Sequence, residues 1–211
     1  KKHIHPAILH KKPIPRAGGL AIYIGIALAA IIFVPFDNFI KTIFIGGFIV
    51  VITGVLDDKF DLSPYVRFGI NILTAAIAVY AGVTVPFITN PLGGMLHFTD
   101  FQFVILSQTF HLGDILAIIW IVWVMNMLNW SKGVDGQMPG IAAISAFVIG
   151  IAAFRFISTE HLSYATSMIS FIVGGASLGF LVYNFYPAKI FPGYSATILG
   201  YFIGILSITS G

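Results

Sequence analysis

The sequence predicts an all-α, polytopic membrane protein, with about seven transmembrane helices and a small β-hairpin on the external side. Of the 211 residues, 58% are hydrophobic and 9% are charged, whereas soluble domains carry about 25% charged residues. The chain has no cysteine, which excludes a disulfide framework and a thiolate metal site. We therefore expect a single transmembrane domain over residues 1–211, as a fragment truncated at both ends.

Apolar segments separated by short polar or proline-containing breaks give the individual helices. The expected spans are residues 18–34, 39–56, 66–83, 112–128, 141–157, 164–183 and a seventh from about residue 196. Residues 84–111 lack a helical pattern, and within them residues 96–103 alternate apolar and polar side chains, which is the period of a strand. Because a turn signal at residues 90–94 precedes this stretch, we expect one small hairpin outside the bilayer.

Counting these spans places four polar segments on one face of the membrane. They are residues 1–16, 57–61, 129–137 and 184–195. Most of the lysines and arginines fall on this face, and only Lys41 and Arg155 fall on the other. The positive-inside rule therefore makes the face with the polar segments cytoplasmic. Polar segments that converge on one membrane face predict an active site, and its basic residues could receive an anionic, phosphate-bearing substrate.

The acidic segment carries adjacent carboxylates, Asp57 and Asp58, with Asp61 shortly after them. Adjacent carboxylates repel in a low-dielectric site unless a cation or a polar ligand compensates them. Mg²⁺ prefers oxygen ligands and commonly takes one or two carboxylates together with substrate phosphates. These residues are therefore candidate ligands of Mg²⁺ or of a metal–diphosphate; the alternative is a solvated helix end.

The second polar segment combines amides, a lysine and a carboxylate. Asn126 and Asn129 are three residues apart, so both can face the same side of a helix and contact a metal or a phosphate; the alternative is hydrogen bonding between helices. Lys132 is a point charge suited to phosphate. Asp135 lies in the turn 133–136 before the next helix, where backbone N–H groups can meet anions.

Basic residues elsewhere on this face are candidate substrate-binding groups. They are Lys11, Lys12, Arg16, Lys59 and Lys189. The basic residues 10–16 could equally hold anionic lipid next to the membrane. Asn71 is a polar residue in the middle of a span, and polar residues in mid-span would suit a transporter or channel. The gathering of polar residues at one face favours an enzyme over that class.

Four motifs on this face resemble one known family. They read HKKPIPRAGG at residues 10–19, GVLDDKFDLS at 54–63, NMLNWSKGVDG at 126–136 and YNFYPAKIF at 183–191. The resemblance is to the polyprenyl-phosphate N-acetylhexosamine-1-phosphate transferases, glycosyl transferase family 4. The chain is more similar to the undecaprenyl-phosphate GlcNAc-1-phosphate transferases than to the MurNAc-pentapeptide enzymes.

The resemblance implies the reaction, the cofactor and the setting. Such enzymes move a sugar 1-phosphate from a UDP-sugar to a polyprenyl phosphate, release UMP and use Mg²⁺, here in the plasma membrane of a bacterium. Asp57, Asp58 and Asn129 would hold the metal, and Asp135 would belong to the nucleotide-sugar pocket. The expected partners are the UDP-sugar, the polyprenyl phosphate and the bilayer, with a second copy of the chain as a further candidate and no nucleic acid.

Two positions depart from the family pattern. Lys132 stands where the family has an aspartate, and Tyr194 follows Gly193 where the family has an acidic metal ligand. Both changes remove negative charge, and Lys132 adds positive charge. One interpretation is an active enzyme with weakened or altered use of Mg²⁺, in which Lys132 joins Asp57 and Asp58 as a catalytic residue. The other is a degenerate relative that binds nucleotide-sugar or lipid carrier without turnover.

Overall fold

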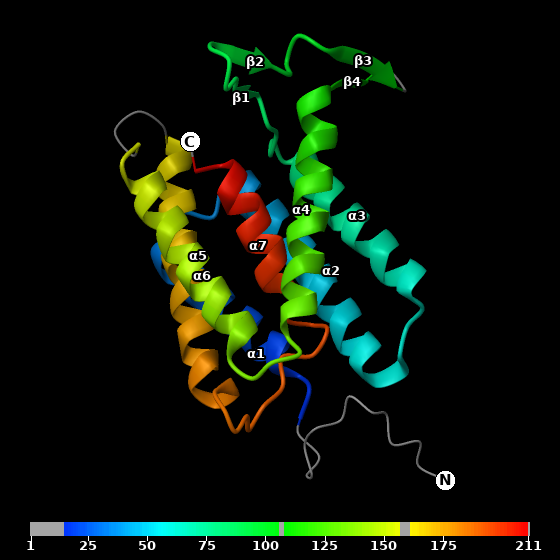
Figure 1. The fold of residues 1–211 in the computed structure, drawn as a ribbon, viewed down its shortest axis with the longest axis vertical. Helices are drawn as coiled ribbons and strands as arrows, with labels where there is room; N and C mark the ends of the chain where they lie inside the picture. The colour runs from blue at the N-terminus through cyan, green and yellow to red at the C-terminus, as the bar shows by residue number, and fades with distance from the viewer. Residues whose placement is uncertain (1–14, 106–107, 157–160, 211) are drawn as a thin grey trace.

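The computed structural model describes residues 15–105, 108–156 and 161–210, and over these residues the chain forms a bundle of helices capped at one end by short strands (Figure 1). The helices are α1 (Gly18–Phe33), α2 (Asn38–Phe60), α3 (Pro64–Tyr80), α4 (Leu112–Ser131), α5 (Gln137–Phe154), α6 (His161–Asn184) and α7 (Thr197–Ile208). These described helices match the seven expected segments, so the all-α prediction is confirmed.

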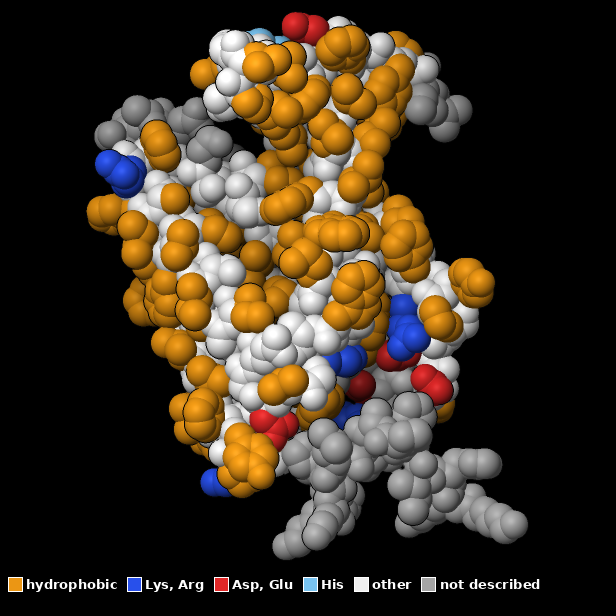
Figure 2. Space-filling view, viewed as in Figure 1, with side chains coloured by type: hydrophobic (Ala, Val, Ile, Leu, Met, Phe, Trp, Pro, Cys, Tyr) orange, Lys and Arg blue, Asp and Glu red, His pale blue; other side chains and the backbone are white. Residues whose placement is uncertain are grey.

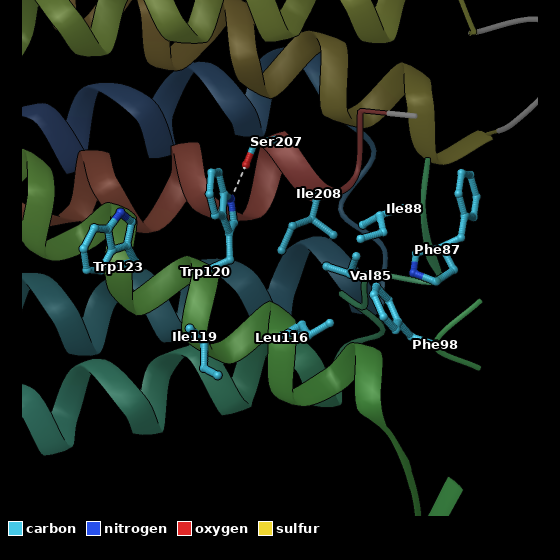
Figure 3. A pocket seen from close by; sticks show the side chains of 11 residues that line it. Val85, Phe87, Ile88, Phe98, Leu116, Ile119, Trp120, Trp123, Ser207 and Ile208 are labelled. Atoms are coloured by element: carbon cyan, nitrogen blue, oxygen red, sulfur yellow. Dashed lines mark hydrogen bonds between the residues drawn. The ribbon is translucent and has the colours of Figure 1, made fainter. Parts of the chain in front are cut away.

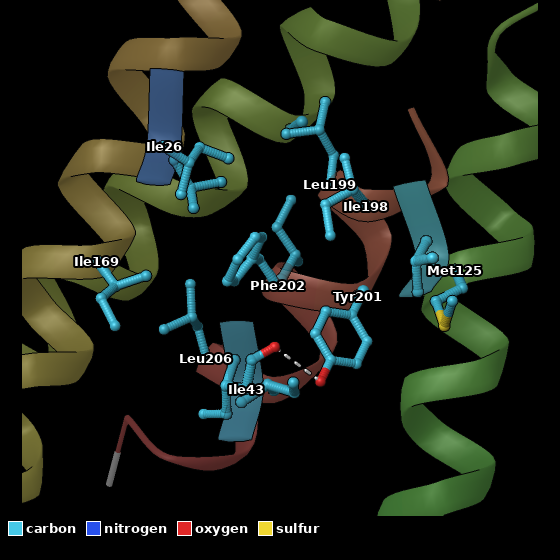
Figure 4. Packing of buried hydrophobic residues seen from close by; sticks show 14 of the residues in the cluster. Ile26, Ile43, Met125, Ile169, Ile198, Leu199, Tyr201, Phe202 and Leu206 are labelled. Atoms are coloured by element: carbon cyan, nitrogen blue, oxygen red, sulfur yellow. Dashed lines mark hydrogen bonds between the residues drawn. The ribbon is translucent and has the colours of Figure 1, made fainter. Parts of the chain in front are cut away.

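Helix α7 forms the centre of the bundle. It lies between α4 on one side and the α5–α6 pair on the other (Figure 1), and every residue from Thr197 to Leu206 is buried. Tyr201 and Phe202 are fully buried and point into the surrounding helices (Figure 4). Burial of a helix on all sides requires apolar residues around its whole circumference, which α7 has.

Glycines let α7 approach α4 closely. A Cβ added at Gly200 would lie 2.5 Å from the Cα of Met125, and one added at Gly204 would lie 3.0 Å from the Cα of Ile121. Small residues permit this close packing of two helices in general. Gly175 and Gly179 of α6 have the same spacing but make no such contact, because an added Cβ there meets no described atom of another element within 4 Å.

The surface of the bundle is suited to a membrane. Helices α2, α4, α5 and α6 are long and apolar enough to cross one, whereas α1, α3 and α7 are apolar but shorter. Hydrophobic side chains cover the middle of the molecule, and most of the charged side chains in view gather near the end opposite the strands (Figure 2). This arrangement separates an apolar belt from a polar end.

Residues 84–111 form two hairpins instead of the expected one. Strand β1 (Phe87–Thr89) pairs antiparallel with β2 (Met95–His97), and β3 (Gln102–Ile105) pairs antiparallel with β4 (Gln108–His111). The stretch 96–103, expected to be one strand, is interrupted because Phe98 donates its N–H to the carbonyl of Pro86 and Phe101 donates to Phe98. This turn separates β2 from β3 and divides the segment between two sheets.

A large apolar cavity lies at the hairpin end of the bundle. It has a volume of about 740 Å³ and is lined by β1 and the residues just before it, by Phe98, by α4 and by the end of α7 (Figure 3). Trp120 donates its indole N–H to the hydroxyl of Ser207 at 2.8 Å on its wall. The lining contains no charged residue, so the cavity is separate from the polar end.

Helix α2 extends further than the sequence predicts. The expected span ends at residue 56, but the helix continues to Phe60, with Asp61 as a left-handed C-cap at φ 52°. Lys59 in the last turn complements the negative end of the helix dipole. Asp57 and Asp58 therefore lie on the last helical turn, where the backbone fixes the directions of their side chains.

Candidate active site

Elements far apart in the sequence meet at the end of the molecule opposite the hairpins. They are the last turn of α2, the start of α3, the end of α4 and the loop 185–196 that leads into α7 (Figure 1). Gly193 has φ +71°, and a Cβ there would overlap the carboxylate of Asp58 and the carbonyl of Arg16. A Cβ at Gly54 would overlap the backbone of Ser195. Glycine at these positions allows the loop to touch both α2 and the segment before α1.

Asp57 is the most buried of the predicted acidic residues. It is only 8% exposed, and its Oδ2 accepts a hydrogen bond from Nη1 of Arg67 on α3 at 3.2 Å. Its Oδ1 is buried without a hydrogen-bond partner among the described residues. Because a buried carboxylate is costly unless it is paired, Arg67 stabilises the charge while one oxygen remains available to a ligand.

Asp58 faces a different partner from its neighbour. Both of its oxygens accept the backbone N–H of Tyr194, at 2.9 Å to Oδ1 and 3.1 Å to Oδ2. This contact ties the last turn of α2 to the loop before α7. The two carboxylates predicted as a pair of metal ligands are thus held by an arginine in one case and by the backbone in the other.

Tyr194 organises the cations of the site. Its buried ring has the guanidinium of Arg67 5.3 Å from the ring centroid and the ammonium of Lys132 at 5.4 Å. Its hydroxyl accepts a hydrogen bond from Nδ2 of Asn71 at 3.2 Å. Cation–π contacts of this kind gain strength when they are removed from water, so the ring attracts both cations to one place.

Burial also shifts the proton affinities of this group. It raises the pKa of the Tyr194 phenol, so that the phenol stays protonated at neutral pH. It lowers the pKa of the Lys132 ammonium, and the charges of Asp58 and Asp57 oppose that change. The carboxylates thus favour the charged form of a lysine that has lost much of its water.

The second polar segment contacts the same loop. Asp135 accepts the backbone N–H of Ala188 through Oδ2 at 3.0 Å. Asn184 accepts the N–H of Gly136 at 3.0 Å and donates to the carbonyl of Ile190 at 2.9 Å. These contacts hold the turn after α4 against the loop after α6. Asp135 therefore has a structural contact in addition to its predicted role in the nucleotide-sugar pocket.

The two predicted amides differ in their surroundings. Asn126 donates its amide to the carbonyl of Val122 in its own helix at 2.8 Å, which leaves it directed along α4. Asn129 has a buried Oδ1 without a partner among the described residues. The hydroxyl oxygen of Ser195 is in the same condition. Of the two amides, Asn129 keeps an acceptor that a ligand could occupy.

The remaining predicted basic residues lie further from the carboxylates. Lys59 is exposed and its ammonium lies 5.0 Å from the centroid of the neighbouring Phe60 ring. Arg16 and Lys189 are also exposed. Lys11 and Lys12 lie outside the described residues. Lys132 is thus the predicted lysine that the fold brings next to Asp57 and Asp58.

Arg67 and Asn71 contact the site although the sequence assigned them no role in it. They are four residues apart on α3, so they share one helix face, and this face meets Asp57 and Tyr194. Two polar residues at this spacing in an otherwise apolar helix were the signal. Their partner could not be inferred, because Tyr194 is more than 100 residues away in the chain.

Comparison with known proteins agrees with this convergence of motifs. The profile described as glycosyl transferase family 4 matches residues 39–211, a range that includes the carboxylates, the Lys132 turn and the loop to α7. The chain belongs to glycosyl transferase family 4.

Relatives within glycosyl transferase family 4 match almost the whole chain. One is the probable undecaprenyl-phosphate N-acetylglucosaminyl 1-phosphate transferase of Bacillus subtilis, 36% identical over 95% of this chain and 52% of the relative. Another is the decaprenyl-phosphate N-acetylglucosaminephosphotransferase of Mycolicibacterium smegmatis, 32% identical over 96% of this chain and 51% of the relative. A phospho-N-acetylmuramoyl-pentapeptide-transferase of Chlamydia pneumoniae is 28% identical over 91% of this chain. The chain spans about half the length of the first two.

The possible metal ligands of this glycosyl transferase family 4 site do not fit a Mg²⁺ ion held by protein side chains alone. The buried oxygens of Asp57, Asn129 and Ser195 that have no partner are of the type that Mg²⁺ accepts. Across the described part of the chain, however, no three His, Cys, Asp or Glu side chains come together as a metal site. Arg67 and Lys132 already place positive charge beside the carboxylates.

Proposed function

We propose that this protein transfers a sugar 1-phosphate, most simply N-acetylglucosamine 1-phosphate, from a UDP-sugar to a polyprenyl phosphate in the first membrane step of cell-wall or surface-polysaccharide synthesis. The observation that carries the proposal is the convergence of Asp57, Asp58, Lys132 and Asp135 at one end of a glycosyl transferase family 4 bundle. Relatives whose names specify this chemistry add support.

The reaction joins one phosphate oxygen to another phosphorus. An oxygen of the polyprenyl phosphate attacks the phosphorus that carries the sugar, the bond from that phosphorus to the bridging oxygen breaks, and UMP leaves with the electron pair. Such transfers depend on alignment and on neutralising charge more than on covalent chemistry. Fixed dipoles and charges aimed at the reacting phosphates supply both.

Each side chain at the centre would have its own part in this step. Asp57, fixed by Arg67, and Asp58, fixed by the Tyr194 N–H, would take up any proton that the acceptor phosphate carries, and they would hold the neighbouring cations in place for the diphosphate. Lys132 would neutralise charge on the diphosphate. The side-chain oxygen of Asn129 accepts no hydrogen bond from the described residues, and it would contact the UDP-sugar.

The membrane setting follows from where this centre lies. Helices α2, α4, α5 and α6 would span the bilayer and the shorter apolar helices would lie within it, with the polar end in the cytoplasm of a bacterium. The phosphate of the lipid carrier would lie at that membrane face while its polyprenyl tail stays among the apolar helices. Lys11, Lys12, Arg16, Lys59 and Lys189 would attract the anionic substrates toward the centre.

A second candidate function is binding of nucleotide-sugar or lipid carrier without turnover. It is favoured by the lack of a three-residue metal cluster among the described residues and by the cations beside Asp57 and Asp58. Both candidates require nucleotide-sugar or carrier lipid to bind at the same end of the molecule. Only the transferase releases UMP, and that product separates the two.

The test is UMP release by the intact protein in detergent, supplied with UDP-GlcNAc and undecaprenyl phosphate over a series of metal conditions. We expect release by the natural protein and a loss on the order of 100-fold in Asp58→Asn. The matched control is Asp37→Asn, which changes the N-cap at the other end of α2 and keeps a good capping residue. Absence of UMP under every condition, with retained nucleotide binding, would establish the binding protein instead.

A further inference from the structure

We propose that Lys132 and Arg67, gathered on the ring of Tyr194, supply the positive charge for the substrate diphosphate in place of a divalent cation, so that nucleotide-diphosphate binding does not require Mg²⁺. This inference rests on the proposed function, because it names the ligand of that site. The observations that carry it are the two cation–π contacts, the partners of the carboxylates and the balance of charge.

The charges at the centre already cancel. Two positive and two negative side chains lie together there: Arg67, Lys132, Asp57 and Asp58. A divalent cation placed against the carboxylates would lie beside a guanidinium and an ammonium, and like charges at such short range repel strongly in a partly buried site. An anionic diphosphate, by contrast, brings negative charge that both Arg67 and Lys132 attract.

Three of the four carboxylate oxygens at the centre already accept a hydrogen bond, and Oδ1 of Asp57 is the one without a partner among the described residues. Asp57 uses Oδ2 for Arg67, and both oxygens of Asp58 accept the Tyr194 N–H. Both cations keep N–H donors for the substrate, because the contact with Asp57 occupies only Nη1 of Arg67. Arg67 presents a planar fork of five N–H donors suited to phosphate, and among the described residues Lys132 makes no ion pair within 4.0 Å.

Tyr194 is a positioning residue in this arrangement. Its backbone is tied to Asp58 and its hydroxyl to Asn71, so the ring is fixed at both ends. Each cation lies over that ring, which sets the separation between ammonium and guanidinium. Removal of the ring would leave Lys132 and Arg67 in the protein without the contact that holds them near each other. Removal of the hydroxyl alone would keep that contact.

The experiment measures UDP-GlcNAc binding to the intact protein in detergent by calorimetry, in EDTA and in MgCl₂. We expect similar affinities in the two buffers, and at least about tenfold weaker binding in Lys132→Met, because hydrogen bonds to charged groups commonly contribute that much. Lys132→Arg keeps the charge and should keep binding in EDTA. Lys41→Met, an exposed lysine at the other end of α2, is the matched control.

Two further variants separate the roles of ring and charge. Tyr194→Leu should weaken binding in EDTA, whereas Tyr194→Phe should keep most of it. The double variant Lys132→Asp with Tyr194→Asp removes one cation and adds two carboxylates, so its binding should become dependent on Mg²⁺. Thermal unfolding of each variant shows that it is folded before its binding is compared.

The outcomes distinguish this inference from the proposed function. Binding by the natural protein that requires Mg²⁺, or that Lys132→Met leaves unchanged, would overturn the inference even if UMP is released. Binding that persists in EDTA and depends on Lys132 would support it even if no UMP appears, in which case the transferase proposal fails alone.

Discussion

Asn184 shows how one side chain can hold two site loops together. It is 1% exposed, accepts the N–H of Gly136 and donates to the carbonyl of Ile190. Asn126 offers a contrast, because it is only half-buried and bonds to a carbonyl of its own helix. The same side-chain chemistry thus stabilises the fold in one place and adds little in the other.

The substitution Asn184→Ala should lower the free energy of unfolding by about 2 kcal/mol, since it leaves two backbone groups without their partner. Asn126→Ala should change it little, because alanine favours the helix and the lost bond is local. Thermal unfolding in detergent measures both. Equal melting temperatures for the two variants would contradict the role assigned to Asn184.

At the scale of an element, α7 depends on how closely it can approach α4. Gly200 and Gly204 face the backbone of α4, and α7 is buried along its length. The loop before α7 carries Tyr194, so the position of this helix also sets the position of the site. A change in the packing of α7 against α4 should therefore reach Asp58 through that loop.

The substitution Gly200→Ala should destabilise the protein by about 1–3 kcal/mol, because the new methyl overlaps the backbone of Met125 and well-packed helices move little. The matched variant Gly179→Ala adds the same methyl where it meets no described atom within 4 Å. That variant should stabilise by about 0.5–1 kcal/mol through helix propensity. Unfolding measurements that gave both variants the same sign would refute this packing.

At the scale of the whole molecule, charge and the proposed bilayer define an orientation. The carboxylates, the Lys132 turn and the loop to α7 lie at one end, and the hairpins and the apolar cavity lie at the other (Figure 1). Lys41 lies in the first turn of α2, at the opposite end of that helix from Asp57 and Asp58. Lys189 lies in the loop 185–196 that leads into α7. The positive-inside rule then predicts that Lys189 faces the cytoplasm and that Lys41 faces the outside.

Cysteine labelling tests this orientation, because the chain has no cysteine of its own. A membrane-impermeant maleimide should label Lys41→Cys in intact cells, and it should label Lys189→Cys only after the membrane is opened. Both positions are exposed in the fold, so accessibility follows the side of the membrane. Labelling of Lys189→Cys in intact cells would reverse the proposed orientation.

The sequence by itself determined that the protein is helical and predicted that its motifs share one end of the bundle. Runs of apolar residues interrupted by proline and polar breaks define helices locally, so the seven segments could be located without tertiary information. Counting spans predicted one face for the four motifs, and the structure places those at residues 54–63, 126–136 and 183–191 at one end of the bundle, whereas residues 10–14 lie outside the described residues. The substrates, the Mg²⁺ ion and a second copy of the chain as partner stay predictions.

Only the tertiary structure decided how the charges of the site are matched. The partners of Asp57 and Asp58 come from α3 and from the loop before α7, and contacts between distant segments are not encoded in any local pattern. The division of residues 96–103 between two hairpins depended likewise on a bond to Pro86. Tyr194 looked in the sequence like the loss of a ligand; in the folded protein it is the ring on which Arg67 and Lys132 meet, because only packing brings their three segments together.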